Sequence, residues 1–512
     1  MASMFSKPKP FTFPLTFLWI LLLLLSMINY LYFTIYYTLQ NEFRNMTNNL
    51  KIIRNPEWFE VIAREIKNET IKIGLVNMDE IPDEIRTETK MVNIHFDHVD
   101  EHIRWSDLFP ERIDEIIPSK CPNIAMPRFE DYQELDVVIA SVSHYECGVG
   151  GLRNIFRLQI NLVVANLLVR SGRKDNAPLF VVFLGSCGPM WEIFRCDDLL
   201  WNEGDIWVYK PELKMIKQKV LMPVGTCQFV PPFSQLAILT SFLMDEQIQT
   251  ADTMDHLPQP KEAYVTILHS SEDYICGAMA LAQSIIQSNS TKDLVLLVDD
   301  HISLQSQNHL RASGWKIKQI QRIWSPFSTN GSYNEWNYSK LRIWQLKQYD
   351  KVMFIDSDLI VKRSLDRFFV YPQLTAAGNY QKHFFNSGLM LVEPSKCTFD
   401  TLMKTRFVVE SYNGGDQGFL NEMFSWWHRL PAKANYLKVF VDVNDRLHQI
   451  PDDVYAIHYT GVKPWKCRKE YDCNWDGDEF GRYASNSAHK RWWQVYNAMP
   501  KNLRDYCAIN MD

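Results

Sequence analysis

The stretch Lys351-Val352-Met353-Phe354-Ile355-Asp356-Ser357-Asp358-Leu359 decides the fold of the second half of the chain. Its apolar run, bounded by charged residues, is typical of a buried parallel strand. The strand ends on two carboxylates, and open α/β sheets bind ligands at the carboxyl ends of their strands. Carboxylate oxygens suit Mg²⁺ or Mn²⁺ carrying a nucleotide diphosphate. An Asp-x-Asp pair also occurs as an ordinary acidic turn, so the remaining sequence has to separate the two interpretations.

Segments on both sides of this stretch predict α/β units. Buried strands are expected at 264–268 and 294–298 around a helix at 274–288, and at 135–140 and 179–184 around a helix at 154–170. This alternation predicts a smaller α/β domain over 131–257. A second domain is then expected over 258–512. It would be built on a Rossmann-like, doubly wound sheet and end in a C-terminal extension.

The N-terminal region predicts a membrane anchor and a stem. An apolar segment centred on 19–25 is long enough to cross a hydrocarbon core of roughly 30 Å. Lys7 and Lys9 precede it, which favours a cytosolic tail over 1–12 and a signal anchor over 13–35. Residues 36–130 are polar and interrupted by prolines, so we expect a stem there. The body of the protein is therefore expected in a secretory lumen.

Composition narrows the partners and the compartment. The chain has 512 residues and a formal net charge of −6, which gives no basic surface of the kind nucleic-acid binders carry. Ten cysteines and five Asn-x-Ser/Thr triplets are compatible with a secretory lumen. Cys467 and Cys473 lack a second Cys/His pair at zinc spacing, which favours a disulfide or two buried thiols over a metal site.

Four further segments accompany the Asp356-Ser357-Asp358 turn along the predicted domain. They are Asn337-Tyr338-Ser339-Lys340-Leu341-Arg342, Phe385-Asn386-Ser387-Gly388, Gly414-Gly415-Asp416-Gln417-Gly418 and His458-Tyr459-Thr460-Gly461-Val462-Lys463. Each alone has an ordinary structural explanation, such as a turn, a helix cap or a buried histidine. Together they offer an imidazole for a metal shell, cations for phosphates, and amides for sugar hydroxyls.

This set resembles glycosyltransferase family 8 over roughly 262–466. A narrower resemblance, to the plant xylan α-glucuronosyltransferases once called glycogenin-like starch initiation proteins, rests on His269-Ser270-Ser271-Glu272-Asp273-Tyr274, on 467–475 and on 488–496. The resemblance implies a sheet of the mixed GT-A type and a retaining transferase in the Golgi membrane, single-pass and type II. It would place α-glucuronic acid on O-2 of xylose in xylan, using UDP-glucuronate and Mn²⁺, with Mg²⁺ as the other candidate ion. Other wall-glycan transferases or a second copy of the chain are partners that this interpretation leaves open.

The resemblance also assigns roles to individual positions. The metal ligands would be Asp356, Asp358 and His458, and the catalytic residues Asp416, Gln417 and Asn386. The donor would lie among Leu268, Ser270, Ser271, Tyr274, Lys340, Arg342, Ser357, Asn386, Ser387, Gly388, Asp416, Gln417, Gly461 and Lys463. Apart from the resemblance, a glucuronate donor needs a cation for its C6 carboxylate, and Lys340 or Arg342 could supply one. Only Val462 separates Gly461 from Lys463, one residue fewer than in glycogenin-type chains, which leaves the phosphate contact of Lys463 open.

Two questions stay open at this level. Transfer could proceed by front-face attack, the interpretation we favour, or through a covalent intermediate on Asp416. The donor could also be UDP-galactose, UDP-glucose or UDP-arabinopyranose, or the chain could be a catalytically silent Golgi scaffold. The intact Asp356, Asp358 and His458 argue against the scaffold. The sequence leaves the decoration pattern and the disulfide pairing undecided.

Overall fold

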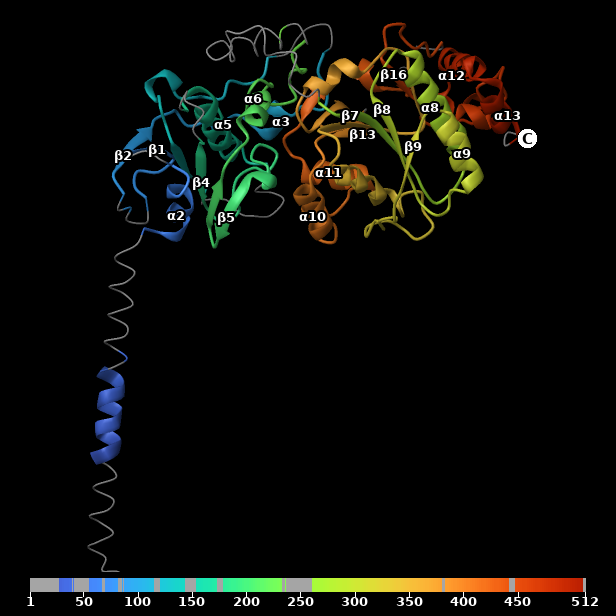
Figure 1. The fold of residues 1–512 in the computed structure, drawn as a ribbon. Coiled ribbons are helices and arrows are strands. Elements are labelled where there is room, and N and C mark those ends of the chain that lie inside the picture. The colour runs from blue at the N-terminus through green and yellow to red at the C-terminus, as the bar shows by residue number, and fades with distance from the viewer. Residues whose placement is uncertain are drawn as a thin grey trace, which may run out of the picture.

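A computed structural model describes residues 27–38, 40, 55–66, 70–81, 85, 87–114, 120–142, 153–172, 178–232, 235, 260–379, 383–441 and 447–509 (Figure 1). Residues 27–38 are helical with exposed side chains. Among the described residues, no helix is both long and apolar enough to cross a membrane. Residues 13–26 of the predicted anchor, like the predicted domain boundary at 257/258, lie outside the described residues.

The first half of the chain forms a six-stranded sheet. Its strand order is β2 (Thr89–Ile94), β1 (Ile71–Val76), β3 (Val137–Ser141), β4 (Phe180–Leu184), β6 (Ile206–Tyr209) and β5 (Leu199–Glu203). The first four strands are parallel, whereas β6 and β5 pair antiparallel. Its helices are α2 (Glu57–Ala63), α3 (Trp105–Leu108), α5 (Ile155–Arg170) and α6 (Leu213–Val220). The strands expected at 135–140 and 179–184 and the helix at 154–170 are thus present.

The stem predicted for 36–130 is wrong over part of its length, because β1 and β2 belong to this sheet. β1 lies between β2 and β3 and pairs in parallel with both. Its side chains are almost entirely buried, and those of α2 pack in the same apolar cluster. The signal was weak because Lys72 and Gly74 interrupt the apolar run of β1, and β2 is a polar edge strand with exposed side chains.

The second half forms a mixed seven-stranded sheet, as expected. Its order is β14 (His428–Leu430), β12 (Thr375–Gly378), β13 (Phe385–Val392), β10 (Lys351–Ile355), β7 (Glu262–Leu268), β8 (Asp293–Val298) and β9 (Lys316–Gln319). Strands β10, β7, β8 and β9 are parallel, and β13 runs antiparallel to β10. A small sheet with the order β11 (Leu359–Val361), β16 (Ala456–His458) and β15 (Tyr436–Leu437) continues from the end of β10.

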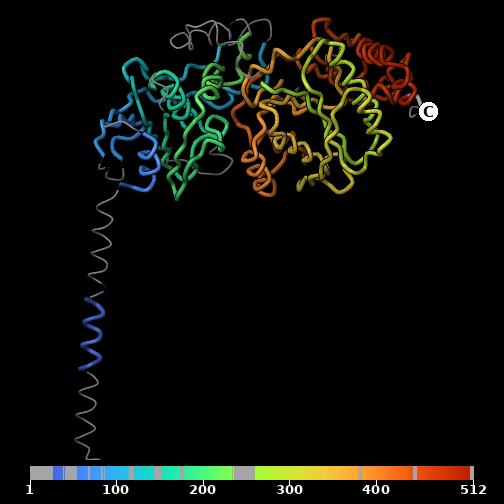
Figure 2. The backbone as a smooth tube through the Cα atoms, in the orientation of Figure 1, coloured from blue at the N-terminus to red at the C-terminus, as the bar shows by residue number. Residues whose placement is uncertain are grey.

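Helices pack around this second sheet. They are α8 (Ile275–Gln287), α9 (Leu304–Ala312), α10 (Lys396–Thr405), α11 (Asp416–Met423), α12 (Asn486–Ala498) and α13 (Lys501–Ile509). Ser303, Ser395 and Ser485 cap α9, α10 and α12 by accepting a backbone hydrogen bond. The C-terminal helices, red in Figure 2, lie beside α8 and α9 at the end of the molecule away from the first sheet.

Short 3₁₀ segments connect the larger elements. They are η1 (Phe129–Asp131), η2 (Cys196–Asp198), η4 (Asn337–Gln345), η5 (Asp366–Val370), η6 (Ala432–Asn435), η7 (Pro464–Lys466), η8 (Cys473–Asp476) and η9 (Gly481–Tyr483). The segment 337–342 lies within η4, η7 directly follows Lys463, and η6 contacts β16, which ends at His458.

The two sheets share one apolar core and are joined covalently. A single cluster contains side chains of α5 in the first half and Trp344 and Trp426 in the second. Oε1 of the buried Glu192 accepts hydrogen bonds from the backbone of Ser425 and Trp426, and the Cys196–Cys397 disulfide links η2 to α10. Three further disulfides are Cys121–Cys227, Cys276–Cys507 and Cys467–Cys473. Of the two alternatives left open for Cys467 and Cys473, the structure has the disulfide.

Candidate active site

The end of β10 brings the two carboxylates of the Asp-x-Asp turn into contact with a distant histidine. The side chains of Val352 to Ile355 are fully buried, so the strand direction is fixed and the turn follows at its carboxyl end. Strand β11 then pairs with β16, with Leu359 opposite His458. That register places Nε2 of His458 3.3 Å from Oδ1 of Asp358. One ligand atom from each of Asp356, Asp358 and His458 lies within 4.8 Å of the others.

The surroundings of this triad fit a divalent cation. A Cβ at Gly388 would lie 2.5 Å from Cε1 of His458 and 3.0 Å from Oδ2 of Asp356, so only glycine allows β13 to approach so closely. Nδ1 of His458 is buried and has no hydrogen-bond partner among the described residues. Two carboxylates and an imidazole are a donor set that divalent metals accept. The predicted ligands therefore meet, and their chemistry suits such an ion.

Two lysines contact the carboxylates of the triad from opposite sides. Nζ of Lys463 is 2.6 Å from Oδ2 of Asp358, and Nζ of Lys340 is 3.4 Å from Oδ1 of Asp356. Lys340 also lies 2.6 Å from Oδ2 of Asp416. Burial alone would lower the pKa of each lysine, but the facing carboxylates raise both pKa values above their ordinary level. Both ammonium groups therefore stay charged at neutral pH.

The two carboxyl groups of the turn differ in acidity. Burial would raise the pKa of Asp358, but the charges of Lys463 and His458 outweigh it and hold that pKa well below its usual range. Burial raises the pKa of Asp356, with Asp358 adding to the shift and Lys340 opposing it. Asp358 is therefore the more firmly ionised of the two. The pair offers one permanent negative charge and one that depends on its cationic neighbours.

A hollow of about 490 Å³ opens beside the triad, between the ends of β7 and β10. We call it the donor hollow. Many of the residues predicted to surround the donor line it: Leu268, Ser270, Ser271, Tyr274, Lys340, Asp356, Ser357, Asp358, Ser387, Asp416 and Gln417. His269 also lines it, and burial lowers the pKa of His269 to about 4, so its imidazole is neutral. The hollow thus combines one strongly charged end with a neutral, hydroxyl-rich end.

A hydrogen-bonded network fixes the predicted catalytic residues. Oδ2 of Asp416, at the start of α11, accepts from Oγ of Ser387 at 2.7 Å as well as from Lys340. Oε1 of Gln417 accepts from Nδ2 of Asn386 and from the backbone N–H of Ser387, both at 3.2 Å. Nε2 of Gln417 donates to the hydroxyl of Tyr412 at 2.8 Å. These contacts hold α11 and β13 in a fixed relation at the floor of the donor hollow.

A second hollow, of about 570 Å³, lies on the other side of the triad. Six predicted residues line it: Asn386, His458, Gly461, Lys463, Asp358 and Tyr274. It shares Asp358, Tyr274 and Tyr333 with the donor hollow, so the two meet at the metal triad. Gly461 has a φ of +78°, and a Cβ there would lie 2.4 Å from Oδ1 of Asn474. Glycine is thus required for the turn that brings Lys463 back to Asp358.

The structure contradicts the prediction for Arg342, which lines neither hollow. Its guanidinium donates to the carbonyl of Gln321 and to Oε1 of Gln345, both at 3.0 Å, and lies over the ring of Phe399. Positions two apart on a 3₁₀ helix point to different sides, so when Lys340 enters the site Arg342 turns away from it. Lys340 is the sole lysine or arginine among the described residues of the donor hollow.

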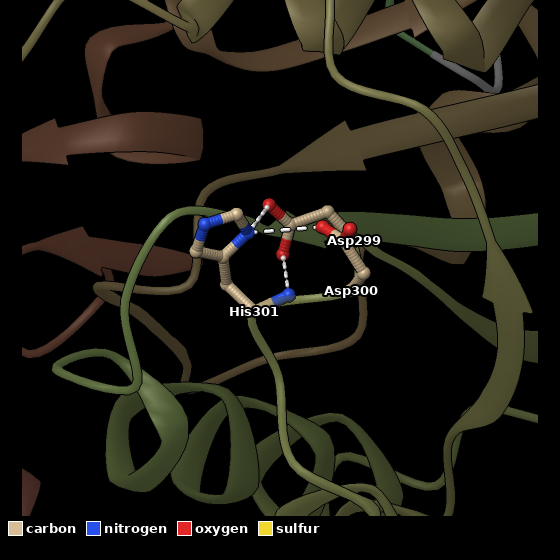
Figure 3. Close-up of side chains that lie close together, drawn as sticks. All are labelled: Asp299, Asp300 and His301. Carbon is tan, nitrogen blue, oxygen red and sulfur yellow. Dashed lines mark hydrogen bonds and ion pairs between the residues drawn. The ribbon is translucent and has the colours of Figure 1, made fainter.

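The sequence did not reveal a set of contacts at the end of β8 that fixes the loop after β7. We call these contacts of Asp299 the brace. Oδ2 of Asp299 accepts from the backbone N–H of Ser270 at 3.0 Å and pairs with Arg322 at 3.2 Å. His301 turns its imidazole toward Asp299 and Asp300 (Figure 3). Ser270 has a φ of +69°, a strained conformation that the Asp299 contact stabilises. The consecutive acids after β8 were visible in the sequence, but their partner was not.

The loop 331–337 is a second feature that the sequence did not reveal. Tyr333, Asn334 and Trp336 line the donor hollow opposite the end of β7. The guanidinium of Arg322 lies 4.2 Å over the ring of Trp336, and its Nη1 donates to Oγ of Ser270. The loop matches no motif, and its aromatic residues alone do not distinguish a binding loop from a packed one.

Comparison with known proteins places both halves of the chain. The family model described as the GUX1-5 N-terminal domain matches residues 47–227, and glycosyl transferase family 8 matches residues 265–373. A putative UDP-glucuronate:xylan alpha-glucuronosyltransferase 4 of Arabidopsis thaliana is 48% identical over 469 residues, covering 90% of this chain and 84% of its own. The UDP-glucuronate:xylan alpha-glucuronosyltransferase 2 of the same plant is 44% identical, covering 90% and 79%.

Solved structures give weaker likenesses. The galactosyltransferase LgtC in complex with donor and acceptor sugar analogs is 16% identical, with a TM-score of 0.34, and covers 47% of this chain and 99% of its own. The glycosyltransferase GlyE of Streptococcus pneumoniae is 21% identical, with a TM-score of 0.35, and covers 49% and 65%. The sequence comparisons, which extend over both sheets, carry the assignment.

Proposed function

The chain belongs to the family of UDP-glucuronate:xylan α-glucuronosyltransferases and is a glycosyltransferase, and from this we propose what it transfers and how. We propose that it moves α-glucuronic acid from UDP-glucuronate to O-2 of xylose residues in the xylan backbone, with Mn²⁺ as its ion. The observation that carries the proposal is the meeting of Asp356, Asp358 and His458 beside a hollow lined with hydroxyl and amide groups.

The donor hollow has the chemistry that a nucleoside diphosphate sugar needs. Its neutral end, with Ser270, Ser271 and His269, suits the uracil and ribose, which carry donors and acceptors but no charge. The diphosphate would lie against the triad and Lys463, where the donor hollow meets the second hollow. The sugar would lie over Ser387, Asn386 and Gln417, whose hydroxyl and amides can pair with its hydroxyls.

The ion and Lys463 would both neutralise negative charge on the leaving diphosphate. A divalent cation at the triad would neutralise the charge that develops on the departing diphosphate. Lys463, already directed at Asp358, supplies a second positive charge whose position is set before reaction begins. Carboxylates suit both Mg²⁺ and Mn²⁺, whereas the imidazole of His458 is a ligand that Mn²⁺ accepts more readily than Mg²⁺ does. This chemistry supports Mn²⁺.

Front-face attack is the mechanism that the site supports better. A covalent intermediate would require Asp416 to act as a nucleophile. Oδ2 of Asp416 instead accepts two strong hydrogen bonds, from Lys340 and Ser387, which reduce its nucleophilicity. The network of Asp416 and Gln417 then stabilises positive charge at the reacting carbon without bonding to it. Intact-mass measurement with UDP-glucuronate and no acceptor tests this, because a glucuronyl-enzyme adduct on Asp416 would overturn front-face attack.

The glucuronate carboxylate calls for a cation, and Lys340 is the candidate within the donor hollow. Its ammonium reaches Asp356, Asp416 and Ser387 from a buried position. A donor carboxylate near Lys340 would add a charge-assisted hydrogen bond that a neutral hexose lacks. The intact triad also supports an active transferase over a silent scaffold.

We further propose a Golgi address, with the body of the protein in the lumen. Four described disulfides support an oxidising compartment, because such bonds are rare in the cytosol. A fluorescent fusion should co-localise with Golgi markers, and its glycans should be removable by an N-glycosidase. A cytosolic distribution of the full chain would contradict this address.

A donor panel tests the proposed activity. The full-length protein with Mn²⁺ and xylohexaose should give product with UDP-glucuronate, and at least about tenfold less with UDP-galactose, UDP-glucose or UDP-arabinopyranose. The Lys340→Met variant should lose this preference along with activity, because the cation for the carboxylate is gone. If the wild-type protein transferred a neutral sugar as fast as glucuronic acid or faster, the assignment of UDP-glucuronate as donor would be wrong.

A further inference from the structure

A series of hollows leads from the metal triad toward the first half of the chain. The hollow of about 570 Å³ beside His458 adjoins a third one, of about 340 Å³. These two share Asn379, Leu437 and Val439 as lining residues. The third hollow is also lined by Glu111, Arg112 and Phe229, which belong to the first half. The hollows therefore form a path between the reacting centre and the seam of the two sheets.

We infer that the xylan acceptor binds along this path, with its reacting xylose beside the triad and its further sugars in the third hollow against Phe229. This inference rests on the proposed function. It assigns the first half of the chain a part in acceptor binding, where an entirely structural role would otherwise suffice. We call the hollow beside His458 the near subsite and the third hollow the distal subsite.

The position of Phe229 is fixed by main-chain contacts to the second sheet. Phe229 forms an isolated parallel bridge with Arg429 of β14, and the backbone N–H of Val230 donates to the carbonyl of Arg429 at 2.9 Å. The guanidinium of Arg429 donates to the carbonyl of Pro110 at 2.7 Å, which holds the segment before Glu111 against the same strand. The first-half wall of the distal subsite is thus attached to the sheet that carries the triad.

The lining of the path suits an uncharged polyhydroxyl chain. Tyr483 in the near subsite and Phe229 and Tyr436 in the distal one offer partly exposed rings for the apolar faces of sugars. Asn379 lies between the two subsites with an amide for hydroxyls. The charged residues of the distal subsite are Glu111, Arg112 and Arg429, and their net charge of only +1 gives little attraction for a polyanion. A nucleic acid or an acidic peptide fits this lining poorly.

Two buried polar residues of the distal subsite are not fully paired. Asn435 is 2% exposed and Arg429 is 5% exposed, and both line the hollow. Among the described residues, Oδ1 of Asn435 and Nε of Arg429 have no hydrogen-bond partner. A hydroxyl-rich ligand, directly or through bound water, is the kind of partner that such groups lack. Asn435 also donates to Oδ1 of Asn386, so the distal subsite is connected to the sugar-binding network.

The test is the dependence of transfer on acceptor length, measured with the full-length protein, UDP-glucuronate and Mn²⁺. The wild-type kcat/KM should be higher for xylohexaose than for xylotriose. Phe229→Ala should lower kcat/KM for xylohexaose by about tenfold, mainly through KM, and leave xylotriose nearly unchanged. Ala432→Trp, which fills the distal subsite from an exposed position, should do the same with little risk to folding.

Two controls keep the outcomes distinct. Phe407→Ala removes an exposed ring that lines none of these hollows. It should leave kcat/KM unchanged for both xylohexaose and xylotriose. Hydrolysis of UDP-glucuronate without acceptor should be the same in every variant, because the donor hollow is intact. Equal losses on both acceptors, or no loss in either variant, would overturn the distal subsite. Donor hydrolysis without transfer to any xylo-oligosaccharide would instead overturn the proposed function.

Discussion

The carboxyl ends of the parallel strands look different in the two sheets of this protein. In the first sheet, the amide of Asn77 after β1 donates to the carbonyl of Ser141 at the end of β3, and Trp207 donates to the carbonyl of Gly185 after β4. In the second sheet, the corresponding edge carries Asp356 and Asp358 with two lysines and a histidine. The contacts described at the first edge are neutral hydrogen bonds, whereas the second edge concentrates charge.

The difference teaches that a shared α/β arrangement does not itself make a site. The described groups of three metal-ligating side chains both belong to the second half of the chain. The first half of the chain contributes through connecting segments outside its sheet, because Phe229 and Glu111 line the distal subsite. On the acceptor proposal above, chemistry and acceptor positioning are divided between the two units, and the predictions below test that division.

The largest effect is expected from Asp358→Asn. This change removes a firmly ionised carboxylate from the triad and puts a neutral amide where Lys463 had a carboxylate partner. Transfer should fall by about a thousandfold or more, as expected for loss of charge stabilisation in a closed site. Asp205→Asn, in the exposed turn between β5 and β6 of the first sheet, is the matched control and should keep full activity. Loss of activity in both variants would contradict the claim that the second sheet, and not the first, carries the reacting groups.

The second effect concerns the link between the units. Replacing both Cys196 and Cys397 with serine removes a crosslink between positions 201 residues apart, and should lower the free energy of unfolding by about 2 to 5 kcal/mol. Denaturant unfolding followed by tryptophan fluorescence measures it. The matched pair Cys467→Ser and Cys473→Ser opens a separation of only 6 residues and should cost less. A larger loss of unfolding free energy in the Cys467/Cys473 variant than in the Cys196/Cys397 variant would show that the two units do not depend on the Cys196–Cys397 bond.

The third effect is a pH dependence of stability from His428, on the edge strand β14. Burial, with a smaller contribution from Lys219, lowers the pKa of His428 to about 3. Between about pH 6.5 and 3 the unfolded chain binds a proton there and the folded chain does not. The free energy of unfolding should therefore fall as pH falls, by about 1.4 kcal/mol per pH unit from this group.

His428→Gln should flatten that slope, measured by denaturant unfolding at pH 6.5 and pH 5. The control is the same substitution at an exposed histidine of the first half, His95→Gln. If both variants retain the wild-type slope, His428 is not the group that titrates.

The smallest effect is expected from Asp299→Ala, which removes the brace under Ser270. The loop after β7 should lose part of its fixed position, so the KM for UDP-glucuronate should rise by about tenfold while kcat changes little. Asp300→Ala is the matched control, since the Asp300 side chain is almost fully exposed. A fall in kcat with unchanged KM would show that Asp299 acts on the chemistry instead of on donor binding.

The strands and motifs of the second half were predictable from the sequence because their signals are local. Strand β10 is a continuous apolar run, and Asp356 and Asp358 follow it directly. The contact between Asp358 and His458 was implied only by resemblance, since it depends on pairing between β11 and β16, which are nearly a hundred residues apart. The assignment of Arg342 failed because residue spacing did not reveal which face of η4 enters the site.

The first half was predicted less completely. Lys72 and Gly74 interrupt the apolar run of β1, and the exposed side chains of β2 hide the alternation that marks a half-buried strand. The role of Phe229 depends on a bridge to Arg429, two hundred residues further along the chain. No local sequence pattern predicts this contact, which becomes apparent only in the structure, where Phe229 lies beside β14.

The most direct test of the central claim is a calorimetric titration of Mn²⁺ into the full-length protein in the presence of UDP. The central claim is that the charged edge of the second sheet holds a metal-bound nucleotide. We expect one ion per chain in the wild-type protein, and loss of that binding when Asp356→Asn, Asp358→Asn and His458→Ala are combined. Mn²⁺ binding of the same strength and stoichiometry in the triple variant would contradict the claim.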